Sequence, residues 1–223
     1  MTSLDELRAL VRELLLSEAS VIDFANAQTD RFGLIKFQLF DHKISLVVVS
    51  TTEKAGDQHL SFPKPLGLLT ATKANSDGWR IAKMYADSAP VAMLLLAASL
   101  EAFGKVYPDY SVSPAAQQVI KRYFDKHKDD PTKVQLGADA DRMKDDSEAE
   151  FLRAAYLGPV GFDMRKAVKQ GERAVDPFIL DQDQETVEDA ILSAASAGFS
   201  KAYSDDERTK SRKKASSDVP SEA

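Results

Sequence analysis

The chain has 223 residues, of which 43% are hydrophobic and 29% charged, and its formal net charge at pH 7 is −6. This composition is ordinary for a folded protein, and the length allows one large domain or a domain with a smaller appendage. The lack of cysteine excludes disulfides, Cys-ligated zinc, iron–sulfur clusters and thiol nucleophiles. The net acidity argues against a protein whose main task is to coat nucleic acid.

The first predicted element is an amphipathic helix within an N-terminal segment, residues 1–31. Leucine and valine side chains recur there at three- and four-residue spacing over residues 4–15, so they share one face. Ser3 and Glu6 form a capping-box pattern at the start of this helix. No apolar run reaches the roughly 20 residues that a bilayer requires, so we expect no membrane segment and a cytoplasmic protein.

Two β-hairpins are predicted next. Residues 32–40 and 44–50 are rich in β-branched and large apolar side chains and are joined by three polar residues. Residues 66–72 and 79–85 flank a segment rich in turn-forming residues and form the second pair. The stretch 52–65 contains a glycine and two prolines, which predicts a loop between the hairpins.

Helical periodicity replaces strand alternation after the second hairpin. A nearly all-apolar helix is predicted to begin at Ser88, with Pro90 in its first turn, and to end near Phe103. A helix that is apolar on all sides is usually packed against a sheet. A short strand at 105–107 and a helix over 115–126, opened by a Ser-Pro pair, are predicted to follow.

The C-terminal part of the chain differs in composition from this core, residues 32–126. Residues 127–146 are rich in acids and are predicted to form a linker, and residues 147–203 a helical appendage. Three helices are predicted in the appendage, at about 147–157, 163–174 and 184–202. Residues 204–223 are predicted to be a disordered tail. Its basic residues keep nucleic-acid binding open as an alternative.

These elements together predict an α/β (α+β) fold, with a mixed, mainly antiparallel sheet flanked by helices and a C-terminal helical appendage. The three histidines, His42, His59 and His127, are far apart and begin no paired-ligand motif, so we expect no metal. The sequence also lacks the glycine-flanked serine of α/β-hydrolases, the P-loop and the dinucleotide-binding glycine run. Those absences argue against serine hydrolases, P-loop NTPases and nicotinamide dehydrogenases.

The order of elements over residues 32–126 resembles the core of GNAT-type N-acyltransferases, especially the compact members carried by bacteriophages. The stretches that carry the resemblance are 79–86, 90–103 and 106–116. The resemblance implies that the fourth strand ends in a splayed gap. It also implies that the first amides of the next helix hold the pyrophosphate of acetyl-CoA, because aligned N–H groups at a helix start favour an anion.

The implied cofactor contacts follow the end of the strand and the start of the helix. They are Tyr85, Ala86, Ser88, Ala89, Val91 and Ala92. The family's glycine-rich turn falls near residues 87–92, where this sequence has no glycine to allow close approach of the backbone. Pro90 removes one amide donor, and Asp87 adds negative charge beside a polyanion.

Three residues are candidates for the chemistry that the resemblance implies. Asp87 and Glu53 are candidate bases that take a proton from the attacking amine. Tyr123 is the candidate acid, although counting from Ser113 as in the family leads to Ile120, three positions earlier.

The function expected from the resemblance is N-acetyl transfer from acetyl-CoA to an amine. The acceptor is left open between a modified nucleobase of DNA and a protein side chain, and a phage-encoded enzyme would act in the host cytoplasm. The alternative is a catalytically inactive GNAT-like accessory or virion interaction protein. In that case residues 147–203 would bind a protein partner, and the helix over 87–103 would only fill the core.

Overall fold

The structure is a computed structural model that describes residues 21–55, 62–74, 78–108, 113–136, 149–175 and 192–193, apart from the side chains of 38–40, 55, 62 and 114. The predicted helix over residues 4–15 and the tail 204–223 lie outside the described residues, as does most of the predicted helix over 184–202. Within the described residues, no helix combines the length and hydropathy needed to span a bilayer.

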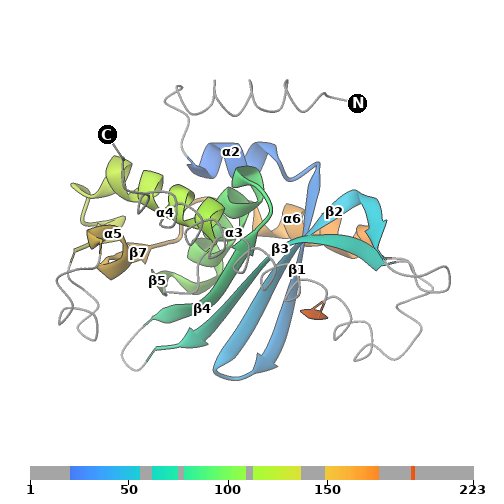
Figure 1. Cartoon of the computed structure of the whole chain (residues 1–223), viewed down its shortest axis with the longest axis horizontal. Coiled ribbons are helices and arrows are strands. Elements are labelled where there is room, and N and C mark those ends of the chain that lie inside the picture. Colours follow the sequence, from blue (N-terminus) through green and yellow to red (C-terminus); the bar gives the residue numbers. More distant parts are fainter. Residues whose placement is uncertain are drawn as a thin grey trace, which may run out of the picture.

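A single mixed sheet of seven strands organises the described residues, in the order β1-β2-β3-β4-β5-β7-β6 (Figure 1). The strands are β1 (Phe32–Phe40), β2 (Lys43–Ala55), β3 (Phe62–Lys73), β4 (Trp79–Ala86), β5 (Lys105–Tyr107), β6 (Val134–Gln135) and β7 (Ala155–Leu157). Neighbouring strands are antiparallel except β4 and β5, which are parallel. The predicted mixed, mainly antiparallel sheet flanked by helices is therefore confirmed.

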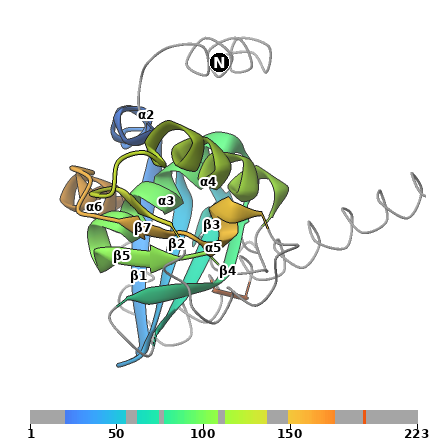
Figure 2. The ribbon, with the colours of Figure 1, turned by 90° about the vertical axis from the view of Figure 1, so that its left-hand side faces the viewer.

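Helices cover this sheet. They are α2 (Val21–Ala27), α3 (Ala89–Phe103), α4 (Pro114–His127), α5 (Glu150–Arg153) and α6 (Met164–Ala174). Figure 2 shows α2, α3 and α4 grouped together, with α3 packed against strands β2 to β5. Helix α6 lies along β1, where a Cβ on Gly33 or on Gly171 would collide with backbone of the opposite element. Glycine at both positions lets the helix and the strand approach closely.

Helix α3 forms the centre of the core, as its sequence predicted. All residues from 90 to 100 are buried, because strands contact the helix on one side and α2 and α4 on the other. Burial on every side is the physical reason for its apolar circumference. The helix ends at Gly104, whose φ of 72° lies in the left-handed region that glycine adopts at helix ends.

Both hairpins are confirmed, but the loop predicted over residues 52–65 is wrong at its two ends. Strand β2 continues to Ala55 and β3 begins at Phe62, and Lys54 lies opposite Pro63. The register between β2 and β3 is shifted on both sides of Val49. Irregular pairing of this kind accommodates prolines inside a strand, which explains why the proline signal was misleading.

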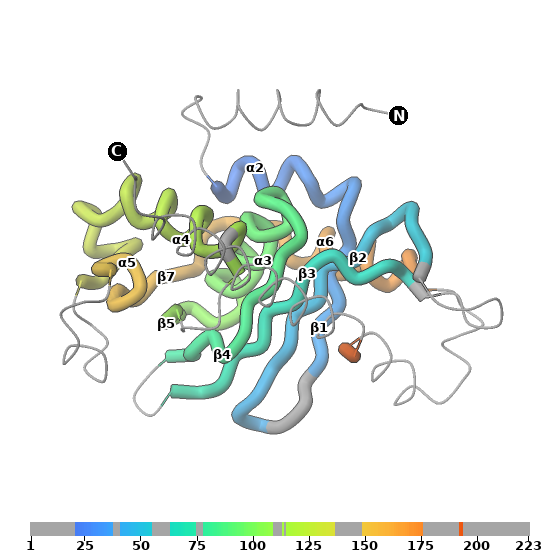
Figure 3. The backbone as a smooth tube through the Cα atoms, viewed as in Figure 1, coloured from blue at the N-terminus to red at the C-terminus, as the bar shows by residue number. Residues whose placement is uncertain are grey.

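The sheet also continues beyond residue 126, where the sequence predicted only a linker and helices. Residues 134–135 form β6 and residues 155–157 form β7, and β7 pairs with both β5 and β6. Figure 3 shows β7 next to β5. The helix predicted over 147–157 is reduced to the four residues of α5, whereas the helix predicted over 163–174 is confirmed as α6. Strands of two and three residues are too short to show an alternating pattern.

Candidate functional site

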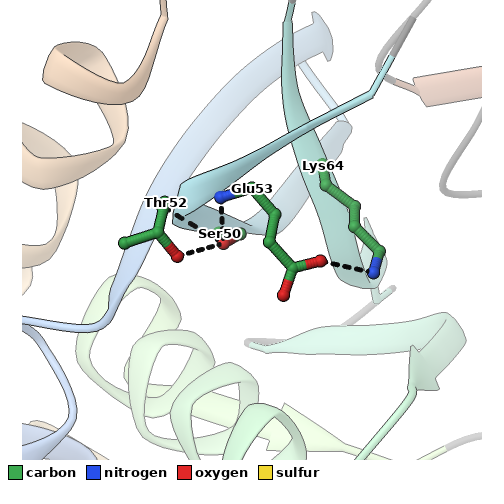
Figure 4. Close-up of polar contacts among 4 residues, drawn as sticks. All are labelled: Ser50, Thr52, Glu53 and Lys64. Carbon is green, nitrogen blue, oxygen red and sulfur yellow. Dashed lines mark hydrogen bonds and ion pairs between the residues drawn. The ribbon is translucent and has the colours of Figure 1, made fainter. Parts of the chain in front are cut away.

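Charged side chains from neighbouring strands meet beyond the end of β4. The Glu53 carboxylate on β2 accepts a hydrogen bond from the Lys64 ammonium on β3 at 2.7 Å, and both side chains are exposed (Figure 4). The buried Ser50 hydroxyl accepts hydrogen bonds from the amides of Thr52 and Glu53, at 3.2 and 2.9 Å. Ser50 therefore fixes the backbone from which the Glu53 side chain extends.

Asp87 follows directly after β4 and belongs to the same cluster. Its Oδ1 accepts a hydrogen bond from the Ser88 hydroxyl at 2.9 Å. Loss of surrounding water raises the pKa of the Asp87 carboxyl, and Glu53 adds to this, while the Ser88 hydrogen bond and Lys64 act in the opposite direction. A carboxylate with a raised pKa is a better proton acceptor than an ordinary one.

Tyr85 and Lys64 complete this group of side chains, which influence one another's pKa values. Partial burial, followed by the negative charge of Asp87, raises the pKa of the Tyr85 phenol. The hydrogen bond and charge of Glu53 raise the pKa of Lys64. The structure thus brings together the predicted residues Glu53, Tyr85 and Asp87. Lys64 was missed because it lies between two prolines in the segment predicted as a loop.

The amides between the end of β4 and the first turn of α3 differ in whether they already have acceptors. Ala86 N–H donates to the Ser113 hydroxyl at 3.3 Å, and Ala92 N–H donates to the Ser88 carbonyl at 3.0 Å. Within the described part of the chain, the amides of Ser88, Ala89 and Val91 donate to no protein group. The Ser88 side chain does not cap the helix, because its hydroxyl donates to Asp87 instead. These three amides remain available to an anion.

Strands β4 and β5 separate soon after they pair. Trp79 lies opposite Val106 and Arg80 opposite Tyr107, and the parallel ladder ends there. Ser113 next meets β4 where its amide donates to the Met84 carbonyl at 2.9 Å. Residues 81–83 between these points face no strand on that side among the described residues. A register shift in the β3–β4 pairing leaves Ala82 without an opposite residue, and such bulges bend a strand.

Tyr123 is in a different part of the fold. It lies on α4 with 1% of its surface exposed, and its ring centroid is 4.5 Å from that of His127 and 5.9 Å from that of Tyr156. Burial raises the pKa of its phenol to about 12. The structure thus groups Tyr123 with His127 and Tyr156, whereas Asp87 and Glu53 lie in the charged cluster beyond β4.

Tyr123 and His127 line a cavity of about 510 Å³ between α2, α4 and the segment 157–161. The Glu101 carboxylate, from α3, accepts hydrogen bonds from the amides of Val160, Gly161 and Phe162 at 3.0, 3.0 and 3.3 Å. The Asn26 side chain, from α2, donates to the Gly161 carbonyl and accepts from the Asp163 amide. The cavity wall is therefore held by residues far apart in sequence, which no local pattern reveals.

The described residues contain no group of three His, Asp or Glu side chains arranged to hold a metal ion. No protein-family model, curated protein or solved structure matches this chain. The chemistry of the charged cluster beyond β4 and of the cavity beside α4 is therefore the basis for a functional proposal.

Proposed function

We propose that the chain is a GNAT-like N-acetyltransferase that binds acetyl-CoA beside β4 and transfers its acetyl group to an amine. The observation that carries the proposal is the separation of β4 from β5 after Arg80, combined with the unused amides at the start of α3. Further support comes from the element order β1 to α4, which follows the order on which the family resemblance rests.

The residues at the start of α3 fit a diphosphate in part. The amides of Ser88, Ala89 and Val91 would hold its oxygens, since a helix start favours negative charge. Lys64 provides the nearby cation. Asp87 and Glu53 oppose binding, because both carry negative charge in the same cluster. We therefore expect the affinity for acetyl-CoA to be modest and to depend strongly on the charge of Asp87.

When bound, acetyl-CoA supplies an acetyl group activated as a thioester. The unpaired edge of β4 over residues 81–83 would position that group with backbone hydrogen bonds. The Asp87 carboxylate would take the proton that the acceptor amine loses as the new amide bond forms. Glu53 is the weaker candidate base, since it is already paired with Lys64. Tyr123 has no part in this proposal because it lies with His127 in the cavity beside α4.

Calorimetric titration of acetyl-CoA, with the Asp87→Asn and Lys64→Met variants, tests this proposal. Asp87→Asn removes a like charge, so binding should become several-fold tighter while acetyl transfer to amines is lost. Lys64→Met should weaken binding several-fold, and Lys121→Met, a change of the same charge on the exposed face of α4, should leave it unchanged. Bound ligand at about 100 times its Kd should also stabilise the fold by roughly 2.7 kcal/mol.

The alternative, an inactive GNAT-like accessory or interaction protein, is favoured by one observation. The Ala86 and Asp87 amides already donate to Ser113 and Leu66, so part of the expected anion site is closed within the protein. The same titration separates the two functions. Absence of binding in both the natural protein and Asp87→Asn would leave only the inactive alternative.

A further inference from the structure

Three polar side chains that line the cavity beside α4 make no hydrogen bond or ion pair within the described residues. Within the described residues, the Tyr123 hydroxyl makes no hydrogen bond; the residue is 1% exposed, and its hydroxyl oxygen is not among the fully buried atoms that lack a partner. The His127 imidazole likewise makes only a ring contact with Tyr123, and the Lys133 ammonium is in no ion pair. All three side chains line the cavity. Tyr123 is buried as a residue, His127 is half-buried and Lys133 is exposed, so the three side chains remain available to a ligand in the cavity.

Tyr156, the neighbour of Tyr123, shows the ordinary situation. Its hydroxyl donates to the Phe151 carbonyl at 2.6 Å, which satisfies the group inside the protein. The two tyrosine rings contact each other, yet Tyr123 lines the cavity and Tyr156 is not among its lining residues. The difference indicates that the Tyr123 hydroxyl is left for a group that is not part of the chain.

The charges acting on His127 favour a negative ligand, although the negative charge of Asp130 acts in the opposite direction at both His127 and Tyr123. Burial lowers the pKa of His127 first, and Lys133 and Lys126 lower it further, whereas only Asp130 raises it. Asp23 lines the cavity from the α2 side and does not contribute to this shift. The field at the imidazole is therefore net positive, and a neutral imidazole keeps one N–H donor.

We propose that this cavity is a binding site for a small organic anion, whose carboxylate or phosphate group accepts hydrogen bonds from Tyr123, His127 and Lys133. The lining also includes Ile22, Leu157 and Val160, which would contact the carbon part of the ligand. The volume of about 510 Å³ is in the range of known small-molecule sites. The wall is already fixed by Glu101 and Asn26, so little ordering is needed on binding. This site is separate from the charged cluster beyond β4 and does not depend on acetyltransferase activity.

Nuclear magnetic resonance of the histidine rings provides the test, because the chain has only three histidines. Benzoate and phenyl phosphate are the probes, and acetate and inorganic phosphate are their counterparts without an apolar part. The His127 signals should shift on titration, while those of His42, exposed in the β1–β2 turn, should not. Whichever of carboxylate and phosphate binds with the lower Kd identifies the ligand class. Benzoate and phenyl phosphate should each bind more tightly than acetate and inorganic phosphate, because only they can contact the apolar lining.

Two pairs of variants test whether the change in the His127 signals comes from binding in the cavity. Each pair compares a cavity-lining residue with a similar residue outside the cavity. Tyr123→Phe should weaken binding about tenfold without loss of stability, whereas Tyr156→Phe should lose stability and keep the affinity. Lys133→Met should weaken binding about tenfold, whereas Lys121→Met on the outer face of α4 should not. The proposal is overturned if the His127 signals do not move at about 10 mM of any probe. It is also overturned if the affinity is the same in Tyr123→Phe and Lys133→Met as in the natural protein.

Discussion

The two polar regions of this fold differ in whether their groups already have partners. Beyond β4, Glu53 is paired with Lys64 and Asp87 with Ser88. Beside α4, the Tyr123 hydroxyl has no partner among the described residues although its side chain is buried. Paired, exposed charges need no ligand, whereas a hydroxyl without a protein partner on a cavity-lining residue can form a hydrogen bond to a ligand. The two regions therefore differ in the partners of their side chains: in the charged cluster the side chains pair with one another, and only the amides at the start of α3 are left for a ligand.

The walls of the two regions are also built differently. The charged cluster lies on two adjacent hairpins and a helix start, so its residues are brought together by strand register. The cavity depends on side chains that reach across the fold, such as Glu101 to the segment 160–162. Changes in that segment should therefore affect the cavity most.

Gly158→Ala should have the largest effect, because a Cβ there would collide with the backbone carbonyl of Leu100 on α3. Backbone atoms move less readily than side chains, so we expect unfolding free energy to fall by about 3 kcal/mol. Gly161→Ala is the matched control in the same segment: its Cβ meets nothing within 4 Å, but φ is 79°. That substitution should cost only about 1 kcal/mol. Urea unfolding measures both, and equal costs would mean that the cavity wall is not rigid.

Tyr156→Phe and Tyr123→Phe should have unequal effects on stability, although each removes one hydroxyl from the same pair of rings. The Tyr156 hydroxyl donates to Phe151, so its loss should cost about 1 kcal/mol and leave a carbonyl without a donor. Tyr123→Phe should change stability by less than about 0.5 kcal/mol, because that hydroxyl has no partner within the described residues. Thermal or urea unfolding decides this, and a similar loss in both variants would contradict the contrast between the two tyrosines.

The sequence was sufficient for the parts of the fold that depend on local patterns. Alternating and β-branched residues predicted β1 to β4, and the all-apolar run with Ser88 and Gly104 at its ends predicted α3. The sheet beyond β5 was not predictable in this way, because β6 and β7 are held by pairing with β5 and not by any pattern of their own.

Candidate site residues were predictable only where they are close in sequence to a strand end. Asp87 and Tyr85 flank the end of β4, so their proximity followed from the predicted elements. Lys64 depends on the irregular register between β2 and β3, which the sequence does not specify. Tyr123 was selected by counting along α4, but counting does not determine which neighbour its hydroxyl faces; the fold places it beside His127.

Asp87→Asn should change stability by less than Tyr156→Phe, and its pH dependence distinguishes the charged cluster from the cavity. The pKa of Asp87 is raised in the folded protein above its ordinary value of 3.8, mainly by loss of water. Ionisation is therefore harder in the folded than in the unfolded chain, and stability is lost as the pH rises through the folded pKa. The variant should thus match the natural protein below pH 3.8 and be more stable at neutral pH.

Although its carboxyl has lost part of its surrounding water, Asp87 is still an exposed residue. The increase in unfolding free energy of Asp87→Asn at neutral pH should therefore stay below about 1 kcal/mol. Asp129→Asn, which removes the same charge at an exposed position after α4, serves as the control for the change in net charge. Unfolding curves between acidic and neutral pH measure both variants. If Asp87→Asn and Asp129→Asn raise the unfolding free energy equally, the Asp87 carboxylate is not destabilised in its cluster. The same conclusion follows if Asp87→Asn is more stable than the natural protein only at low pH. Asp87 would then lose its advantage over Glu53 as a proton acceptor.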